Sequence, residues 1–543
     1  MPTLEAWSGA VAGSVSRQYD TFFRESTESV NGGSTVSYGY DADGLLTSAA
    51  TTTATLSVHR QAATGLLDST TVGVGVGRVG STLSYDSHGD LQELGWTKGG
   101  VSYYHERIER DSLGRITQID ETIAGVSTSR TYGYDAAGRL TSVTEAGNPA
   151  ANRGWEYDDN QPGNGNRTRA TYGPGVPADT ATYDVQDRLL SYGVSEYDWT
   201  AAGELLHRNR PGESLSTTYD VLGNLVSAAL TGQVSGSQGS EPPPSTLVSY
   251  RVDGQNHRVE RRVGGAGSPR TQRWLYRDGL AVVAELDSTN ALVNRYVYGT
   301  QDHVPDLLVR AAGTYRVITD HLGSIRALVN ITTGAVAQRI DYDAWGNETA
   351  NTAPTLQALG YAGGLTDPET KFIRFGARDY DPGVGRWTAK DPEFPESGST
   401  SAYVYVDSDP LDFGDASGAS KGGRRNLDGD DPLLRKLREI WDRFAKGEIS
   451  REEATRLSEE LAKQAATSAR RKQAFNALLK VLRRGETMCL IGGALLDILA
   501  DPAEANPLAT DGAPAPHVIP GIEVTARRKQ NPSRREPMRI PND

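Results

Sequence analysis

The sequence predicts a mainly β protein that is built from repeated hairpins. Three observations support this fold class: a Tyr-Asp turn signature that returns along the chain, a composition of 60 Gly and only 8 Phe in 543 residues, and alternating polar and apolar residues beside the turns. At this length one ordinary compact core is not expected, so the chain should form several domains or an elongated array.

The commonest form of the repeat is Tyr-Asp-x-x-Gly. The aspartate can accept hydrogen bonds from backbone amides just ahead of it, and the glycine supplies the positive φ that the turn needs. Each unit is therefore expected to be a hairpin whose Tyr ring packs on neighbouring strands. The copies begin at Tyr40, Tyr85, Tyr134, Tyr197, Tyr219 and Tyr342, with looser ones at Arg110, Tyr157 and Tyr183.

The character of the sequence changes after Gly418. Asp431 before Pro432 is a good helix start, and Ser450 with Glu453 forms a capping box for a second helix. Apolar residues continue at helical spacing, at Leu433, Leu437, Ile440, Trp441, Phe444, Ala454, Leu457, Leu461, Ala474, Phe475, Leu478, Leu479 and Leu482. The last forty or so residues are rich in proline and are expected to be extended or disordered.

The net charge of −13 is unevenly distributed. From Lys421 to the end there are about 23 Lys and Arg against about 18 Asp and Glu, so an acidic body precedes a mildly basic tail. Such a tail could bind an anionic partner or the acidic body itself, although solvated helix faces explain much of the difference in charge. Nucleic acid is not the expected partner.

Targeting and membrane signals are weak. The lone Cys489 excludes an internal disulfide framework and a multi-cysteine zinc cluster, and it is expected to be a buried thiol. The stretch from Met488 to Ala500 is too short to span a bilayer and carries Asp497, so we expect a buried helix there; an interfacial or pore-forming segment is the alternative. The first thirty residues have no secretory signal, so the chain is expected to be a fragment or to be exported by another route.

A dense group of motifs follows residue 319 and resembles the RHS-repeat-associated core of RHS/YD-repeat proteins. It comprises Thr319-Asp320-His321-Leu322-Gly323, Tyr342-Asp343-Ala344-Trp345-Gly346, Arg374-Phe375-Gly376-Ala377-Arg378-Asp379-Tyr380-Asp381-Pro382, Gly385-Arg386-Trp387 and Asp391-Pro392. These motifs occur in the family's order and, with the upstream repeats, cover residues 30–420.

The resemblance implies a hollow β shell of YD repeats, closed by the core as a plug. It divides the chain into a repeat shell (1–300), a core (301–420), a helical variable domain (421–505) and an extended or disordered tail (506–543). In polymorphic-toxin and toxin-complex relatives the shell encloses its own C-terminal domain, often a toxin. Teneurins use related shells in adhesion. Secretion or cell-surface exposure is implied, with an immunity protein, delivery proteins and a glycan or protein receptor as further partners.

The resemblance also implies an aspartyl autoprotease in the core. The family pairs two Asp-Pro-x-Gly motifs, and the matching aspartates here are Asp391 and Asp415, with Phe394 in place of Gly and Ala416 in place of Pro. Two carboxylates that share a proton can activate water and protonate the leaving amide. Arg386 is predicted to keep one of them ionised, or else to form a structural ion pair. Cleavage is expected near residues 419–423, and the alternative is that both aspartates only cap turns.

Other signals do not indicate chemistry. Gly75-Val76-Gly77-Arg78-Val79-Gly80 has the spacing of a dinucleotide fingerprint, but a β-like segment follows it, so no cofactor is expected. Asp41-Ala42-Asp43-Gly44 echoes a calcium loop but has Thr52 where Glu is required, so no metal site is expected. His321 is expected to be structural, and the tail residue His517 is expected to be a loop residue and not part of a nuclease site.

Two functions remain open. In the first, the shell stores and presents a C-terminal effector and releases it by autoproteolysis. In the second, the chain is an adhesion or structural shell with an inert helical tail. Residues 421–543 offer scattered Glu and Arg and one His, and no catalytic motif is identified among them.

Overall fold

The structure is a computed structural model that describes residues 3–73, 77–158, 164–232, 246–264, 269–277, 279–395, 399, 401–419, 450, 453, 456 and 457. The chain divides into two compact units, Met1–Glu486 and Thr487–Asp543, and all described residues belong to the first. Among these residues no helix is both long and apolar enough to cross a membrane.

Strands β1 to β31 form one sheet in which each strand pairs antiparallel with the next strand along the chain. We call β1 to β23 the wall. Its first strands are β1 (Leu4–Trp7), β2 (Gly13–Tyr19), β3 (Glu25–Val30), β4 (Gly33–Tyr40), β5 (Leu46–Ala50), β6 (Thr55–Arg60), β7 (Leu67–Val72), β8 (Val79–Tyr85), β9 (Leu91–Lys98), β10 (Val101–Arg110) and β11 (Ile116–Ile123). The wall continues with β12 (Val126–Tyr134), β13 (Leu140–Glu145), β14 (Arg153–Tyr157), β15 (Arg167–Thr171), β16 (Asp179–Tyr183), β17 (Leu189–Tyr192), β18 (Ser195–Trp199), β19 (Leu205–Arg210), β20 (Glu213–Tyr219), β21 (Leu225–Gly232), β22 (Thr246–Val252) and β23 (Arg258–Gly264), with a short 3-10 turn at Pro149–Ala151.

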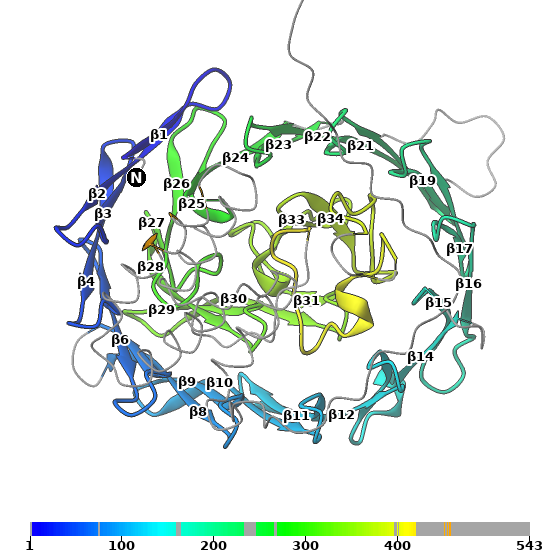
Figure 1. Ribbon diagram of the computed structural model, residues 1–543, viewed down its shortest axis with the longest axis horizontal. Helices are drawn as coiled ribbons and strands as arrows, with labels where there is room; N and C mark the ends of the chain where they lie inside the picture. Colours follow the sequence, from blue (N-terminus) through cyan, green and yellow to red (C-terminus); the bar gives the residue numbers. More distant parts are fainter. Residues whose placement is uncertain are drawn as a thin grey trace, which may run out of the picture. The chain divides into compact units, whose positions relative to one another are not determined.

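The remaining strands lie inside the ring that the wall traces in Figure 1. The inner strands are β24 (Arg270–Arg277), β25 (Ala281–Leu286), β26 (Leu292–Val297), β27 (Leu307–Arg310), β28 (Gly313–Thr319), β29 (Ile325–Asn330), β30 (Val336–Tyr342) and β31 (Glu348–Asn351). A second sheet of four strands follows in residues 352–419, which we call the plug: β32 (Leu365–Thr366), β33 (Ile373–Phe375), β34 (Arg378–Asp381) and β35 (Arg386–Trp387), with 3-10 turns at Tyr361–Gly363 and Val406–Ser408. The predicted β architecture is therefore confirmed, and the large sheet runs on past residue 300. The division at residues 300 and 420 stays a prediction.

An aspartate carboxylate organises most of the predicted turns. Asp135 Oδ1 accepts the backbone N–H groups of Ala137 and Arg139, both at 2.9 Å, and Gly138 has a φ of +82°. The same pair of bonds, to the second and fourth residues onward, recurs at Asp20, Asp41, Asp86, Asp111, Asp184, Asp220, Asp253, Asp287, Asp320 and Asp343. The predicted Asp and Gly chemistry of the hairpins is confirmed.

One copy is shifted by two residues from its predicted place. Asp198 lies within β18, and Thr200 Oγ1 takes the turn position by accepting the N–H groups of Gly203 and Glu204 at 3.2 and 3.1 Å. Trp199 then stands where other repeats have Tyr. The register of the copy is set by the distance to Gly203, whose φ is +102°, and not by the Tyr-Asp pair.

In most copies of the signature the tyrosine connects its repeat to the preceding one. Tyr134 donates from its hydroxyl to the backbone oxygen of Ile116 at 2.8 Å, one repeat earlier in the wall. Equivalent bonds at 2.6 to 2.8 Å come from Tyr40, Tyr85, Tyr157, Tyr183, Tyr276 and Tyr298, and Trp199 donates its indole N–H to Leu189. The prediction that the Tyr rings pack on neighbouring strands is confirmed.

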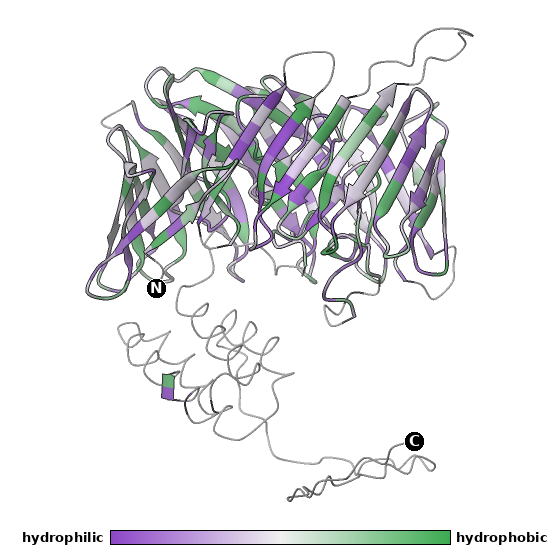
Figure 2. Ribbon diagram, turned by 90° about the horizontal axis from the view of Figure 1, so that it is seen from above, coloured by the Kyte–Doolittle hydropathy of each residue, from purple (hydrophilic) through white to green (hydrophobic). Residues whose placement is uncertain are grey.

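Apolar side chains of the wall face the inner strands and the plug. One core cluster joins Val15 and Val30 of the wall to Tyr296 of β26, and a second joins Leu56 and Leu94 to inner strands. Two further clusters reach the plug, since Leu205 and Leu225 pack in one cluster with Phe372 and Val384, and Ile116 and Leu140 pack in another with Leu411. The core is therefore the interface between two layers of the same chain, and Figure 2 shows apolar and polar residues alternating along the strands.

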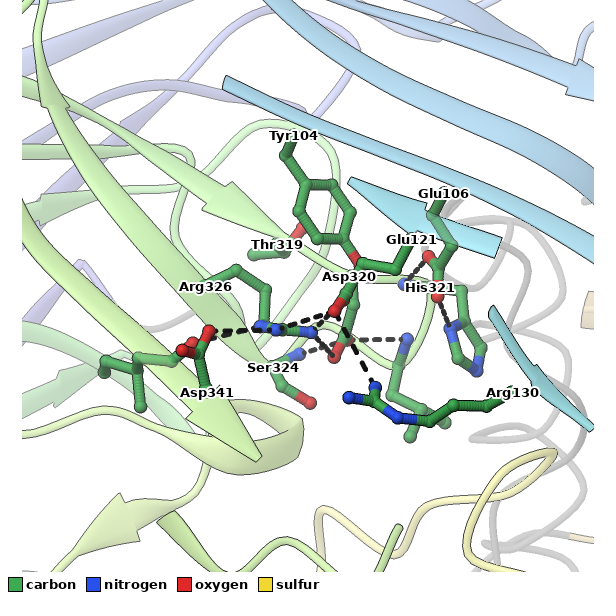
Figure 3. A network of polar contacts seen from close by, with 12 residues as sticks. Tyr104, Glu106, Glu121, Arg130, Thr319, Asp320, His321, Ser324, Arg326 and Asp341 are labelled. Carbon is green, nitrogen blue, oxygen red and sulfur yellow. Dashed lines mark hydrogen bonds and ion pairs between the residues drawn. The ribbon is translucent and has the colours of Figure 1, made fainter. Parts of the chain in front are cut away.

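Polar contacts between these layers are buried as well (Figure 3). His321, in the turn after β28, donates its backbone N–H to Glu106 of β10 at 3.0 Å. Its Nδ1 lies 2.7 Å from Glu106 Oε1 and its Nε2 lies 2.9 Å from the backbone oxygen of Leu411 in the plug. A second contact between the same layers is the ion pair of Arg326 in β29 with Glu121 in β11. His321 therefore has the structural role that the sequence predicts, joining wall, inner strands and plug.

Several predictions fall mainly outside the described residues. These are the helices of 421–505, the tail of 506–543, the thiol of Cys489, the apolar stretch from Met488 to Ala500 and His517. Within the second predicted helix, Glu453 donates its backbone N–H to Ser450 Oγ at 3.1 Å, which is one of the two bonds of the predicted capping box.

Replacing Asp135 with alanine should weaken its hairpin by about 1 to 2 kcal/mol, because two backbone N–H groups and Arg139 lose their acceptor. Amide hydrogen exchange at Ala137 and Arg139 measures the local opening, which should become roughly tenfold more frequent. The exposed neighbour provides a control, Ala136→Ser, that should exchange as the parent does. Unchanged protection in Asp135→Ala would show that the carboxylate does not hold the turn.

The stability of the chain should fall between about pH 6.5 and pH 9 because of His321. Burial alone lowers the pKa of His321, but the charge and hydrogen bond of Glu106 outweigh it and raise the pKa to about 9. A raised pKa gives a contribution that is complete below the unfolded value and is lost as pH rises through the folded one. The loss is up to about 3 kcal/mol. Urea unfolding should show it in the parent and in an exposed-site control, His88→Gln, but not in His321→Gln; an equal loss in His321→Gln would refute the assignment.

Candidate functional site

One buried arginine joins the two aspartates that the sequence singles out. Arg378 Nη2 lies 3.3 Å from Asp391 Oδ2 and 3.4 Å from Asp415 Oδ2. All three side chains belong to the plug and are buried, with exposed fractions of 3%, 7% and 2%. The two carboxylate oxygens can therefore be no further apart than the sum of those two distances.

Two glycines allow the chain segment of Asp415 to approach Arg378. Gly376 (φ +38°) precedes β34, and Gly418 (φ +64°) follows Asp415. A Cβ atom on Gly418 would lie 2.0 Å from the backbone oxygen of Phe375, and one on Gly376 would lie 2.1 Å from that of Ser417. The Ala377 N–H also donates to the Ser417 oxygen at 2.8 Å. Bulkier residues at either glycine would push the Asp415 turn away from β34.

Each aspartate also organises a short turn of its own. Asp391 Oδ1 accepts the backbone N–H of Glu393 at 2.8 Å, and the Asp391 N–H donates to Ala402 at 3.0 Å. Asp415 Oδ1 accepts the hydroxyl of Ser417 and the N–H of Gly418, both at 2.8 Å, and the N–H of Ala419 at 3.3 Å. In both residues Oδ1 is bound to the turn, and Oδ2 faces Arg378.

The remaining donors of Arg378 point at backbone oxygens. Its Nε donates to the oxygen of Gly418, and its Nη1 donates to that of Ala402 at 3.3 Å. The guanidinium lies 4.1 Å from the centroid of the Trp387 ring, so one of its faces rests on an aromatic surface. Arg378 thus contacts both carboxylates and the peptide group that joins Gly418 to Ala419.

The electrostatics of the site are unbalanced, because two carboxylates share one cation. Burial raises the pKa of Asp415 above its usual value, and the hydrogen bonds of its turn and the charge of Arg378 only partly oppose this. Burial likewise lowers the pKa of Arg378, against the two carboxylates. Chemically, a buried carboxyl group with a raised pKa beside a second carboxyl group is suited to general acid and base catalysis.

Arg386 lies apart from this pair. Its Nη1 donates to Asn166 at 2.9 Å, its Nη2 donates to the backbone oxygen of Asp187 at 2.6 Å, and its guanidinium stacks on Tyr183. The contact predicted between Arg386 and a catalytic carboxylate is therefore corrected: the cation at the pair is Arg378, and Arg386 joins the plug to the wall. The reason is strand alternation in β35, where neighbouring residues face opposite sides of the sheet.

Arg378 is the residue that sequence reasoning missed. It stands in the quoted motif ending in Asp379-Tyr380-Asp381-Pro382, but no spacing in that motif relates it to Asp391 or Asp415. A usable signal was the run of charged residues in Arg378-Asp379-Tyr380-Asp381 within a densely apolar and aromatic region, since a guanidinium that is buried there needs carboxylate partners.

A small cavity adjoins the Asp415 turn. It has a volume of about 30 Å³ and is lined partly by Gly376, Ala416, His257, His303 and Arg374. This is room for a water molecule among polar groups. No cluster of three or more His, Cys, Asp or Glu arranged to hold a metal occurs in the described part of the chain.

Comparison with known proteins gives a family and a set of related folds. The family described as Teneurin YD-shell matches residues 3–405. Teneurin-4 of Homo sapiens is 26% identical over 342 residues, which are 61% of this chain and 11% of that protein. The tRNA nuclease WapA of Bacillus subtilis (strain 168) is 25% identical over 239 residues, which are 42% of this chain and 9% of that protein. The chain therefore spans about a tenth of these relatives.

Two solved structures share the fold. A crystal structure of TcdB2-TccC3-Cdc42 matches with a TM-score of 0.60 at 18% identity, over 75% of this chain and 21% of that one. A Tc holotoxin pore of Photorhabdus luminescens matches with a TM-score of 0.60 at 18% identity, over 77% of this chain and 22% of that one.

Removing the central cation should destabilise the plug strongly. In Arg378→Met two buried carboxylates lose their partner, and the expected loss in the free energy of unfolding is about 3 to 5 kcal/mol near pH 7. Adding Asp391→Asn and Asp415→Asn to Arg378→Met should restore most of the loss, because neutral amides need no cation. Urea unfolding of the three chains measures this, and equal stability of Arg378→Met and the parent would mean that the three groups do not form one ionic unit.

Proposed function

The chain belongs to the teneurin YD-shell family, and on that basis we propose that it is a shell that encloses its own C-terminal region and releases it by aspartyl autoproteolysis. The observation that carries the proposal is the meeting of Asp391 and Asp415 at Arg378, immediately before the end of the plug. The cut falls near residues 419–423, so that the part of the chain beyond the cut separates from the wall and plug.

The proposed chemistry needs no cofactor. Asp391 accepts a proton from a water molecule, which attacks a peptide carbonyl, and Asp415 donates its proton to the departing amide nitrogen. The raised pKa of Asp415 suits the acid role, because the carboxyl must hold its proton until the bond breaks. Arg378 keeps the pair together and limits the repulsion between two carboxylates.

The proposal that the shell encloses and releases a C-terminal effector draws on the relatives of this chain. WapA is a tRNA nuclease, and we propose by analogy that residues 421–543 of this chain form a variable effector with its own target. Release then frees the effector inside the shell. The site of action is outside the producing cell, and an immunity protein and delivery proteins are the partners that such an effector requires.

A second candidate is an adhesion shell without cleavage, presenting a surface to a glycan or protein receptor. It is favoured by the match to Teneurin-4 and by Phe394 and Ala416, which depart from the usual Gly and Pro of the two aspartate motifs. In this case Asp391 and Asp415 serve only as turn caps and as partners of Arg378.

Purified chain should separate into two fragments on a denaturing gel, whereas Asp391→Asn and Asp415→Asn should each remain one band. Both substitutions keep the size of the side chain and the turn acceptor Oδ1, but they remove the acid and base functions. The matched control is Asp407→Asn, at an exposed aspartate of the plug. A single band from the parent chain would favour the adhesion shell, and two bands from either variant would exclude the aspartyl mechanism.

A further inference from the structure

One peptide bond near the carboxylate pair is held at both of its ends. The bond joins Gly418 to Ala419. Its carbonyl oxygen accepts a hydrogen bond from Arg378 Nε, and its N–H is shared between Asp415 Oδ1 at 3.3 Å and Ser417 Oγ at 3.2 Å. A charged donor on the oxygen and a carboxyl group at the nitrogen are the two contacts that amide hydrolysis requires.

The preceding bond is held differently. The carbonyl oxygen of Ser417 accepts the neutral backbone N–H of Ala377 at 2.8 Å. An oxyanion that forms on that oxygen would gain less than one that faces a buried guanidinium. The turns of the wall differ too: in the Asp135 turn the cation that pairs with Oδ2 is Arg139 of the same turn, at 2.7 Å. In the Asp415 turn the cation comes from β34, because the equivalent position is Ala419.

We propose that Gly418–Ala419 is the scissile bond and that Arg378 is a catalytic residue that stabilises the oxyanion on Gly418. The inference rests on the proposed autoproteolysis and adds the bond and a third catalytic group. Glycine at this position carries no Cβ beside its carbonyl group, and a Cβ here would lie 2.0 Å from the backbone oxygen of Phe375, so glycine lets this segment approach Phe375 closely.

The reaction consumes one water molecule. The water oxygen bonds to the Gly418 carbonyl carbon, and Asp391 takes the proton; negative charge forms on the Gly418 oxygen beside Arg378. Asp415 then protonates the Ala419 nitrogen, and the bond between that carbon and nitrogen breaks. The products are a C-terminal carboxylic acid at Gly418 and an α-amine at Ala419; the acid then passes its proton to that amine and remains as a carboxylate next to Arg378. The proton that Asp391 gains equals the one that Asp415 loses.

The mass of the two fragments from the full chain tests the assigned bond. The wall and plug fragment should end at Gly418, and sequencing of the other fragment should begin at Ala419. A new terminus at any other residue would overturn the assigned bond and leave the proposed autoproteolysis standing. An uncut chain would instead refute the autoproteolysis itself.

Variants test the role of Arg378. In Arg378→Lys the buried charge is kept, but the guanidinium and its several N–H donors are lost. The cleavage rate during cell-free synthesis should therefore fall at least about a hundredfold. The matched control is Arg208→Lys, at a buried wall arginine that pairs with Asp381 of the plug and should cut at the parental rate. Cleavage of Arg378→Lys at the parental rate would overturn the oxyanion role.

A further variant keeps the assignment testable if Arg378→Lys does not fold. Ala419→Pro removes the N–H that Asp415 accepts, while Arg378 and both aspartates stay in place. It should remain uncut between residues 418 and 419. Cleavage of Ala419→Pro at that bond would overturn the role given to the contact between Ala419 and Asp415.

Discussion

The carboxylate of the turn aspartate is the constraint on which the wall depends. In a tight hairpin the backbone N–H groups at the tip have no partner on the opposite strand, and leaving them unpaired costs stability. The aspartate supplies one acceptor for two of them, and glycine supplies the positive φ that closes the turn. In most repeats the tyrosine before it bonds to the previous repeat, as Tyr134 does. Such a turn fixes its own hairpin and also the position of the hairpin before it.

A wall built in this way has an inner face that must be covered, and the same chain covers it. Apolar clusters cover the inner face of the wall, and buried ion pairs join the same layers and favour one alignment of them. Buried ion pairs add little net stability, but a wrong alignment would leave charges unpaired, which is strongly unfavourable. Ion pairs of the same kind, Arg258 with Asp379 and Arg208 with Asp381, join the wall to the plug. The plug therefore packs on the wall in one alignment. This fixed position also holds the side chains of Arg378, Asp391 and Asp415 in place.

Sequence reasoning recovers the parts of this arrangement that are local. The turn at Asp135 is predictable because every participant lies within five residues. The shift to Thr200 was missed because the Tyr-Asp pair at Tyr197 competes with the distance to Gly203 as a marker of register. Asp391 and Asp415 were found through a resemblance, but Arg378 was not, since the glycine contact between the 376 and 418 segments is non-local. Arg386 was misplaced because a strand's sequence does not reveal which of its faces meets the wall.

The central claim is that the rigid plug brings Arg378, both aspartates and the peptide group of Gly418 into one site. A high-resolution crystal structure of the full chain carrying Asp391→Asn would test it most directly, because this substitution should leave the chain uncut. The account predicts the guanidinium of Arg378 between residues 391 and 415, with its Nε on the oxygen of Gly418. A structure in which Arg378 turns away from residue 415, or in which the Gly418 turn is separated from Phe375, would contradict it.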